Sequence, residues 1–428
     1  MVKPTLLDRA AGDARVIVGM GPLQLPSRDE LAADVVRLAA LSTGNRLGLR
    51  RGPASDRRRW RYEPDRLDES VRCWSEDFPG TDHLDLVDKL ILLRRRTPTP
   101  DGVRLYLAGD HLITDLSHAV FGGGLVVRLW VYLSQCASRP TPDWAMAPAE
   151  RPHLLWALTR HLLRRPRSVP ELIAEAHNKI PAATGSDIAA AAGPPEPSTV
   201  TAYLGVGELA ALQEWRRANA PGCSVAVLLM AALTRAFVAA GFDLDPVAHV
   251  VVDVGRYDRS LAEHLGNVAV GLNLPFAAPH DPAALQHELS SAMTSGRPLA
   301  AMLAISAGEW AAEMRRRLGG PDGRGDEPVA IGAGTTLSFS HLLGLDAMPD
   351  GGWLGGFDAH EFAAISDPVG SRGIALLTPK MRDRHDISAS FDARYHHPDA
   401  VARALELATG DPVAILDARE VLDLGEAP

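Results

Sequence analysis

Apolar and polar residues alternate along the first third of the chain in runs that predict a mixture of strands and helices. Residues 14–20 form an apolar run suited to a strand, and residues 31–41 repeat leucine and valine at helical spacing. Ser27 follows a proline and precedes two acids, which is typical of a helix start. Residues 46–51 and 60–63 alternate bulky and charged side chains, so we expect an antiparallel pair of strands.

Two further strands are predicted at residues 84–94 and 103–107, on either side of a proline- and glycine-containing turn. The second strand leads into a polar turn and then a helix-like segment, residues 117–136. Three consecutive glycines at residues 122–124 lie inside that segment, where each costs about 1 kcal/mol relative to alanine. They indicate either close packing or a break in the helix, or backbone room for a ligand.

The second half of the chain is also predicted to contain both helices and strands. Strands are expected at residues 199–204, 249–254, 269–276, 335–339, 362–365, 374–377 and 387–391, and helices at 206–218, 225–240, 282–318 and 400–408. Residues 182–198 are rich in Ala, Gly, Pro and Ser and have little pattern, which is typical of a linker. With 428 residues, we expect an N-terminal lobe over 1–181 and a C-terminal lobe over 199–428.

Composition narrows the class of protein. A net charge of -9 argues against general nucleic-acid binding. The three cysteines are far apart and form no CxxC pair, so neither a disulfide framework nor a metal site is expected. No leader is visible at the N-terminus, and no apolar run approaches the roughly 20 residues that cross a bilayer. We therefore expect a soluble, cytoplasmic protein without a membrane partner, and a monomer.

The strongest candidate for chemistry is His111, which follows the strand-like run 103–107 and precedes the helix-like segment. A histidine has an ordinary pKa of about 6.5, so it can accept a proton near neutral pH as a general base. Asp115, four residues later in the predicted turn, could orient the ring or fix the loop. His249 and Asp253 repeat this spacing, but three valines separate them. In a strand those ends lie about 13 Å apart, so the second match is attributed to chance.

In this context the chain resembles the condensation-domain superfamily of acyltransferases, which includes chloramphenicol acetyltransferase and the condensation domains of peptide synthetases. The signature HHxxxDG is similar to residues 110–116, with Asp110 in place of the first histidine and Leu116 in place of the glycine. Residues 265–267 resemble the family's LGN segment, and residues 251–256 resemble the strand that ends in an arginine. Residues 376–391 resemble the final strands, so the likeness covers nearly the whole chain in order.

The resemblance implies two chloramphenicol acetyltransferase-like α/β lobes that meet in a V, with a tunnel at their interface. His111 would deprotonate an amine or hydroxyl, which attacks a thioester carried by coenzyme A or, in trans, by a carrier protein, and no cofactor would be bound. Asp115 would pair with Arg256 and Asn267 would support the site, while Ser340 would touch the substrate. The implied function is a stand-alone acyltransferase of secondary-metabolite biosynthesis that acts on a small-molecule acceptor.

The two departures from the signature leave alternatives open. Leucine resists the backbone angles that glycine allows, so Leu116 would narrow the tunnel or mark a member with lost or altered chemistry. An acid beside His111, Asp110, would favour its protonated form and weaken it as a base. The main alternative is a catalytically inactive scaffold that binds a carrier protein or an intermediate. A third is cyclisation or hydrolysis in the same tunnel.

Overall fold

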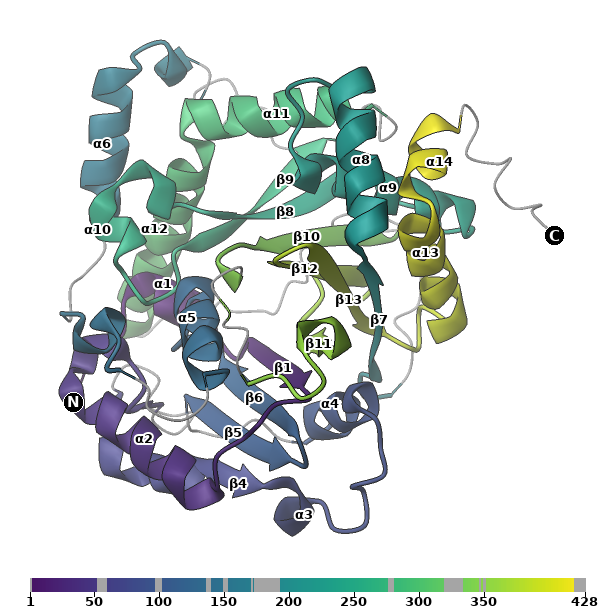
Figure 1. Cartoon of the computed structure of the whole chain (residues 1–428). Coiled ribbons are helices and arrows are strands. Elements are labelled where there is room, and N and C mark those ends of the chain that lie inside the picture. The colour runs from purple at the N-terminus through teal and green to yellow at the C-terminus, as the bar shows by residue number, and fades with distance from the viewer. Residues whose placement is uncertain are drawn as a thin grey trace.

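Two β-sheets, one in the lower half and one in the upper half of Figure 1, organise the chain. The computed structural model describes residues 2–51, 60–96, 102–135, 140–148, 153–170, 172, 193–275, 281–318, 334–345, 348 and 352–418. Of the predicted linker, residues 182–192 lie outside the described residues, and β7 begins at Pro197.

The lower sheet has five strands in the order β11-β1-β6-β5-β4. Their bounds are β11 (Glu361–Ile365), β1 (Arg15–Gly21), β6 (His111–Ser117), β5 (Val103–Ala108) and β4 (Val71–Cys73). All neighbours are antiparallel except β4 and β5. Because β11 comes from far along the chain, the second half of the sequence contributes an edge strand to the sheet of the first half.

Helices cover both faces of the lower sheet. On one face α2 (Arg28–Leu41) and α5 (Gly123–Leu133) share a core with the sheet, and on the other α3 (Trp74–Asp77) and α4 (Leu86–Arg94) do so. The predicted strand at residues 84–94 is wrong, because this segment is α4. Asp85 caps the helix, and Leu86, Leu90 and Leu93 recur at helical spacing and are buried.

The predicted start of α2 is confirmed. The Ser27 side chain accepts a hydrogen bond from the Glu30 backbone N–H, and the Glu30 carboxylate accepts one from the Ser27 backbone N–H. The predicted antiparallel pair after this helix is also present, but it is a separate two-stranded ribbon, β2 (Leu49–Arg50) with β3 (Arg61–Tyr62).

The upper sheet has six strands in the order β7-β13-β12-β10-β8-β9. Their bounds are β7 (Pro197–Leu204), β13 (Arg384–Asp392), β12 (Gly373–Met381), β10 (Thr336–Leu342), β8 (Val247–Asp253) and β9 (Ala269–Pro275). The three central strands β12, β10 and β8 are parallel, so their carboxyl ends lie at one edge. In open α/β sheets, ligands bind outside such carboxyl ends.

The two faces of the upper sheet have different neighbours. One face packs under α9 (Val225–Ala239), α11 (Pro282–Ser295), α12 (Arg297–Arg317) and α13 (Pro398–Gly410). From the other face, Leu342, Leu377 and Met381 pack into the core shared with α2 and α5. This second face therefore joins the two halves of the molecule.

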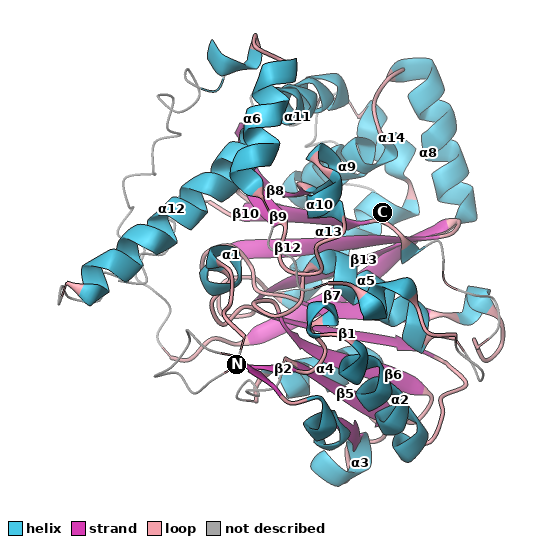
Figure 2. Cartoon of the chain, turned by 90° about the vertical axis from the view of Figure 1, so that its left-hand side faces the viewer, coloured by secondary structure: helices cyan, strands magenta, loops and turns pink. Residues whose placement is uncertain are grey.

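The remaining helices lie around the upper sheet. They are α1 (Leu6–Ala10), α6 (Leu154–Arg164), α8 (Val206–Asn219), α10 (Arg259–Ala262) and α14 (Pro412–Asp417), together with the short 3-10 turn η5 (Gly255–Tyr257). Figure 2 shows α6 lying beside α12 at one end of the molecule. No helix of the described ranges is both long and apolar enough to cross a membrane.

Candidate active site

His111 begins strand β6 instead of preceding a helix, so the predicted strand–turn–helix context is wrong at this residue. Gly109 and Asp110 form the tight turn that joins β5 to β6, and Gly109 takes the left-handed φ of 69° that such a turn requires. The ring Nδ1 lies 2.7 Å from Asp110 Oδ1. Nε2 lies 3.3 Å from Glu361 Oε2 on β11, but the two are not aligned for a hydrogen bond.

The structure does not bring His111 and Asp115 together. Both lie on β6 and face the same side of the sheet, about 13 Å apart, which is the separation that argued against the second HxxxD match. Asp115 is buried and forms a bidentate ion pair with Arg15, with both nitrogen–oxygen distances 2.6 Å. The predicted pair with Arg256 is not formed.

Leu116 is 1% exposed and packs into the core between β1 and β5, opposite Val16 and Val103. It therefore lines no passage, and the expectation that it narrows a tunnel is wrong. Asp110 is half-exposed in the hairpin turn. Asn267 accepts a hydrogen bond from the Ala269 backbone N–H with its side-chain oxygen, 3.2 Å, at the start of β9, which is a local supporting role.

A strand–turn–helix connection does exist seven residues further on. Strand β6 ends at Ser117, and helix α5 begins at Gly123 after Gly122 as its N-cap. Residues 117–123 read Ser-His-Ala-Val-Phe-Gly-Gly, which places His118 at the second histidine of HHxxxDG and Gly123 at its glycine. Ser117 takes the place of the first histidine, and Gly122 that of the aspartate.

Two features of the sequence could have found this register. The glycines at 122–124 are the start of a helix instead of its interior, and glycine is tolerated at such a cap. Residues 112–114, Leu-Ile-Thr, are also typical of a strand, and an apolar residue, Leu116, follows them. The aspartate at the fourth position drew the prediction to His111 instead.

The turn after β6 is held by backbone bonds and by one arginine. The His118 N–H donates to the Ala14 carbonyl (2.8 Å), so the turn stays attached to β1. Arg46 donates from Nε to the Val120 carbonyl at 2.6 Å and is itself paired with Asp8 at 2.8 Å. These groups are buried, so the turn is fixed from both sides.

The same turn touches the second half of the chain. The Gly122 N–H donates to the Leu265 carbonyl (3.3 Å), and a Cβ at Gly122 would lie 2.0 Å from the Gly266 carbonyl oxygen. Gly123 lies beside Leu342 at the carboxyl end of β10. The predicted LGN segment therefore meets the His118 turn where the two halves join.

The His118 ring is suited to accept a proton. The residue is partly exposed, whereas its Nδ1 is buried and makes no hydrogen bond of good geometry, so Nε2 is the nitrogen that can meet a substrate. Burial lowers the pKa of His118 below its ordinary value of 6.5, and the nearby carbonyls of His118 and Phe121 partly offset this effect. The ring is therefore neutral at pH 7, as a base must be.

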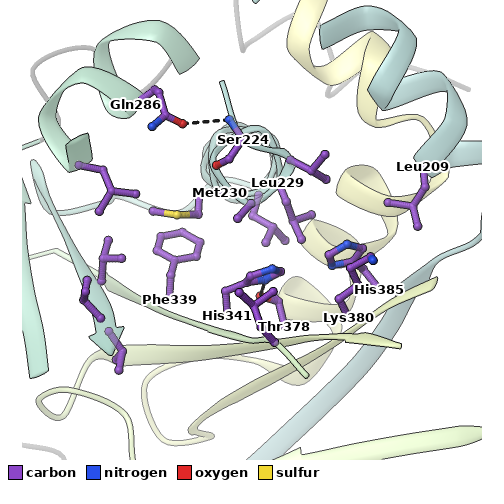
Figure 3. Close-up of a pocket in the computed structure, with 18 of the residues that line it drawn as sticks. Leu209, Ser224, Leu229, Met230, Gln286, Phe339, His341, Thr378, Lys380 and His385 are labelled. Carbon is purple, nitrogen blue, oxygen red and sulfur yellow. Dashed lines mark hydrogen bonds between the residues drawn. The ribbon is translucent and has the colours of Figure 1, made fainter. Parts of the chain in front are cut away.

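The structure also contains a cavity of about 1120 Å³ on the helix-covered face of the upper sheet (Figure 3). Its walls are mainly apolar, and they come from α8, α9 and α11 and from the carboxyl-terminal parts of β8, β10 and β12. Among the polar groups, His341 lies 3.0 Å from Thr378 Oγ1 through Nδ1 and stacks on His385. Phe339 and His341 line the cavity.

Ser340 lies between these two residues on β10, so it faces away from the cavity. It shares that face with Leu342, which is the side of the sheet on which the His118 turn lies. Its substrate contact stays a prediction. A smaller hollow of about 480 Å³ borders Gly124 and Val127 of α5 and shares Leu343 with the large cavity. The two hollows therefore adjoin at the carboxyl end of β10.

Comparison with known proteins identifies the fold. No family model matches the chain, and no curated protein sequence matches it. The first condensation domain of the calcium-dependent antibiotic synthetase is 16% identical with a TM-score of 0.57, over 96% of this chain and 95% of that one. Trichothecene 15-O-acetyltransferase from Fusarium sporotrichioides is 11% identical with a TM-score of 0.55, over 97% and 94%.

A third solved structure is the starter condensation domain of rhizomide synthetase in complex with C8-CoA. It is 13% identical with a TM-score of 0.54, over 98% of this chain and 92% of that one. The chain thus has the fold of the condensation domains and their acyltransferase relatives, which confirms the predicted α/β fold class, while the V-shaped arrangement of two lobes around a tunnel stays a prediction. The likeness extends over nearly the full length of each chain.

Proposed function

We propose that this protein is an acyltransferase that moves an acyl group from a coenzyme A or carrier-protein thioester to an amine or hydroxyl. The observation that carries the proposal is the neutral, partly exposed imidazole of His118 at the junction of the two halves. The fold supports it, because the solved structures it resembles are described as condensation domains and an acetyltransferase.

The reaction needs one base, which removes a proton from the acceptor and later returns it to the leaving group. His118 Nε2 takes the proton of the acceptor N–H or O–H, whose lone pair attacks the thioester carbonyl. The tetrahedral intermediate then collapses, the carbon–sulfur bond breaks, and the imidazolium returns its proton to the departing thiolate. General base catalysis of this kind is worth roughly 10²–10⁴-fold in rate.

His111 is the competing base. It lies at the far end of β6 from His118, away from the contact between Gly122 and Gly266, and neither ring is among the residues that line the hollows described above. The ring nitrogens of His111 lie 2.7 Å from Asp110 Oδ1 and 3.3 Å from Glu361 Oε2, so two carboxylates flank the ring. The geometry therefore favours His118 over the pair of His111 and Asp115.

One observation favours a second function. Gly122 removes the carboxylate of the signature, so a binding scaffold without turnover is the alternative. A carboxylate at residue 122 would have no room, because the Gly266 backbone occupies its place. Arg46 holds the turn instead, so the absence of the carboxylate does not by itself favour an inactive scaffold. The turn is thus held in place without a carboxylate at residue 122.

The test is turnover of acyl-CoA and acyl-N-acetylcysteamine thioesters with amine and alcohol acceptors. His118→Gln, a similar-sized variant, is expected to lower kcat/KM by at least about 100-fold while the unfolding temperature stays within a few degrees. The matched control is His111→Gln, expected to retain activity within a few-fold. The reverse pattern would make His111 the base. If no thioester is turned over, the alternative of a binding scaffold without catalysis is favoured.

A further inference from the structure

A third hollow adjoins the large cavity and is strongly cationic. It measures about 340 Å³ and is lined by Arg160, His161, Arg164, Arg165, Arg256, Tyr257, Met293 and Thr294. It lies between α6, η5 and the end of α11, and it shares Arg256, Met293 and Thr294 with the large cavity. A cationic chamber therefore continues into an apolar one.

Three of the four guanidinium groups form no ion pair with any carboxylate in the part of the chain that the structure describes. Arg160 pairs with Asp258 at 2.9 Å. Within the described part of the chain, Arg164, Arg165 and Arg256 have no ion pair with a carboxylate. Glu263, the C-cap residue of α10, is already paired with Arg259 at 2.6 Å. Like charges held together in this way repel each other, so an anion between them would stabilise the arrangement.

The other polar groups of the chamber are already engaged. His161 Nε2 lies 3.0 Å from the Thr294 carbonyl, and the Tyr257 hydroxyl donates to the Met293 carbonyl at 2.7 Å. These bonds fix the floor of the chamber, so the N–H donors for a ligand come from Arg164, Arg165 and Arg256. Burial raises the pKa of the Tyr257 hydroxyl to about 12, and the nearby charges of Arg256 and Arg165 act in the opposite direction. Their charges therefore converge on one place in a chain whose net charge is -9.

We propose that this chamber binds the phosphate groups of coenzyme A, so that the donor is an acyl-CoA. The inference rests on the proposed acyltransferase function and specifies its donor. Guanidinium groups bind phosphate oxygens through paired N–H donors. Coenzyme A carries a diphosphate and a separate 3′-phosphate, whereas a carrier-bound arm carries a single phosphodiester. A group of three uncompensated guanidiniums suits the more highly charged donor.

The position of Arg256 connects the chamber with the reacting group. It lies on the connection between β8 and β9, and the same connection carries Gly266, which contacts Gly122 in the His118 turn. Because Asp115 pairs with Arg15 and residue 122 is glycine, Arg256 is left available for a ligand. One connection, between β8 and β9, therefore carries both a phosphate-binding arginine, Arg256, and the residue that contacts the His118 turn, Gly266.

The experiment compares two donors that differ in their phosphates. The double variant Arg164→Gln/Arg256→Gln is expected to raise KM for acyl-CoA by about tenfold or more, with kcat changed less than about twofold. The same acyl group on N-acetylcysteamine, which has no phosphate, should show an unchanged KM. The matched control is Arg259→Gln, an exposed and paired arginine that does not line the chamber.

The outcomes separate the two proposals. An unchanged acyl-CoA KM in the double variant, with active wild type, overturns the chamber but leaves the acyltransferase. If the wild type turns over neither thioester, the function falls, and calorimetry with adenosine 3′,5′-bisphosphate still tests the chamber: binding lost in the double variant supports it. Turnover of an acyl-carrier protein, with none of acyl-CoA, overturns the assignment of the donor.

Discussion

A Cβ placed on Gly122 would lie 2.0 Å from the carbonyl oxygen of Gly266. The first residue precedes helix α5 in the first half of the chain, and the second lies before β9 in the second half. Glycine is required at residue 122 by this approach and not by its backbone angle, because its φ of -77° suits any residue. The position where the family signature has an aspartate is thus a point of backbone contact between the halves.

Restoring the signature is therefore expected to damage the protein. Gly122→Asp should lower the free energy of unfolding by about 3 kcal/mol, because a side chain there forces the two backbones apart. Denaturant unfolding measures this loss. The control is Gly124→Ala, which meets no atom within 4 Å and should be neutral or stabilising by up to about 1 kcal/mol. An active, equally stable Gly122→Asp variant would contradict the contact.

Asp115 is expected to matter for stability and not for proton transfer. Asp115→Asn leaves the Arg15 guanidinium buried without its charge partner, which costs about 3–5 kcal/mol. Because His111 lies about 13 Å away on the same strand, the effects of Asp115→Asn and His111→Gln on unfolding should add within about 0.5 kcal/mol. Urea titrations of the single and double variants test this additivity. A coupling free energy larger than about 0.5 kcal/mol would indicate that His111 and Asp115 interact.

Acid should weaken the fold through four histidines whose pKa is lowered. Burial lowers the pKa of His118, His249, His341 and His396 below 6.5. As the pH falls below 6.5, the unfolded chain binds protons that the folded chain cannot, so stability falls. Scanning calorimetry between pH 7.5 and 5.5 should show a falling unfolding temperature. His396→Gln should flatten that slope, while exposed His83→Gln should leave it unchanged.

The activity should respond to pH in the same direction. His118 works as the neutral ring, and its lowered pKa places the loss of kcat/KM below pH 6.5. Full activity at pH 7 with an acidic limb is expected from rate profiles. A limb that lies above pH 7 would argue that another group is the base.

The large cavity is expected to accommodate the acyl chain. Ala226 lies on its wall in the first turn of α9 and is partly exposed. Ala226→Phe should therefore lower kcat/KM for a long-chain thioester about tenfold more than for an acetyl thioester, since each excluded methylene forfeits about 0.8 kcal/mol. Ala211→Phe, on the exposed side of α8, is the control. Equal effects on short and long chains would place the acyl group elsewhere.

The sequence determined the elements and the order in which they occur. The capped start of α2, the strand β5, and the strands and last helix of the second half follow from local periodicity and capping, which are properties of neighbouring residues. Resemblance along the whole chain then indicated the fold. Helix α4 was missed because a short apolar run fits either a strand or a buried helix.

Only the tertiary structure decided which histidine stands at the junction. His111 and His118 both follow β-type residues, and the spacing of an aspartate favoured the first. The decision depends on where the strand ends and on which backbone lies opposite, and both depend on residues far along the chain: Ala14 pairs with His118, Gly266 excludes a side chain at Gly122, and Arg15 takes Asp115. The residues around His111 and His118 do not indicate these distant partners, because the contacts form only when separate segments of the chain pack together.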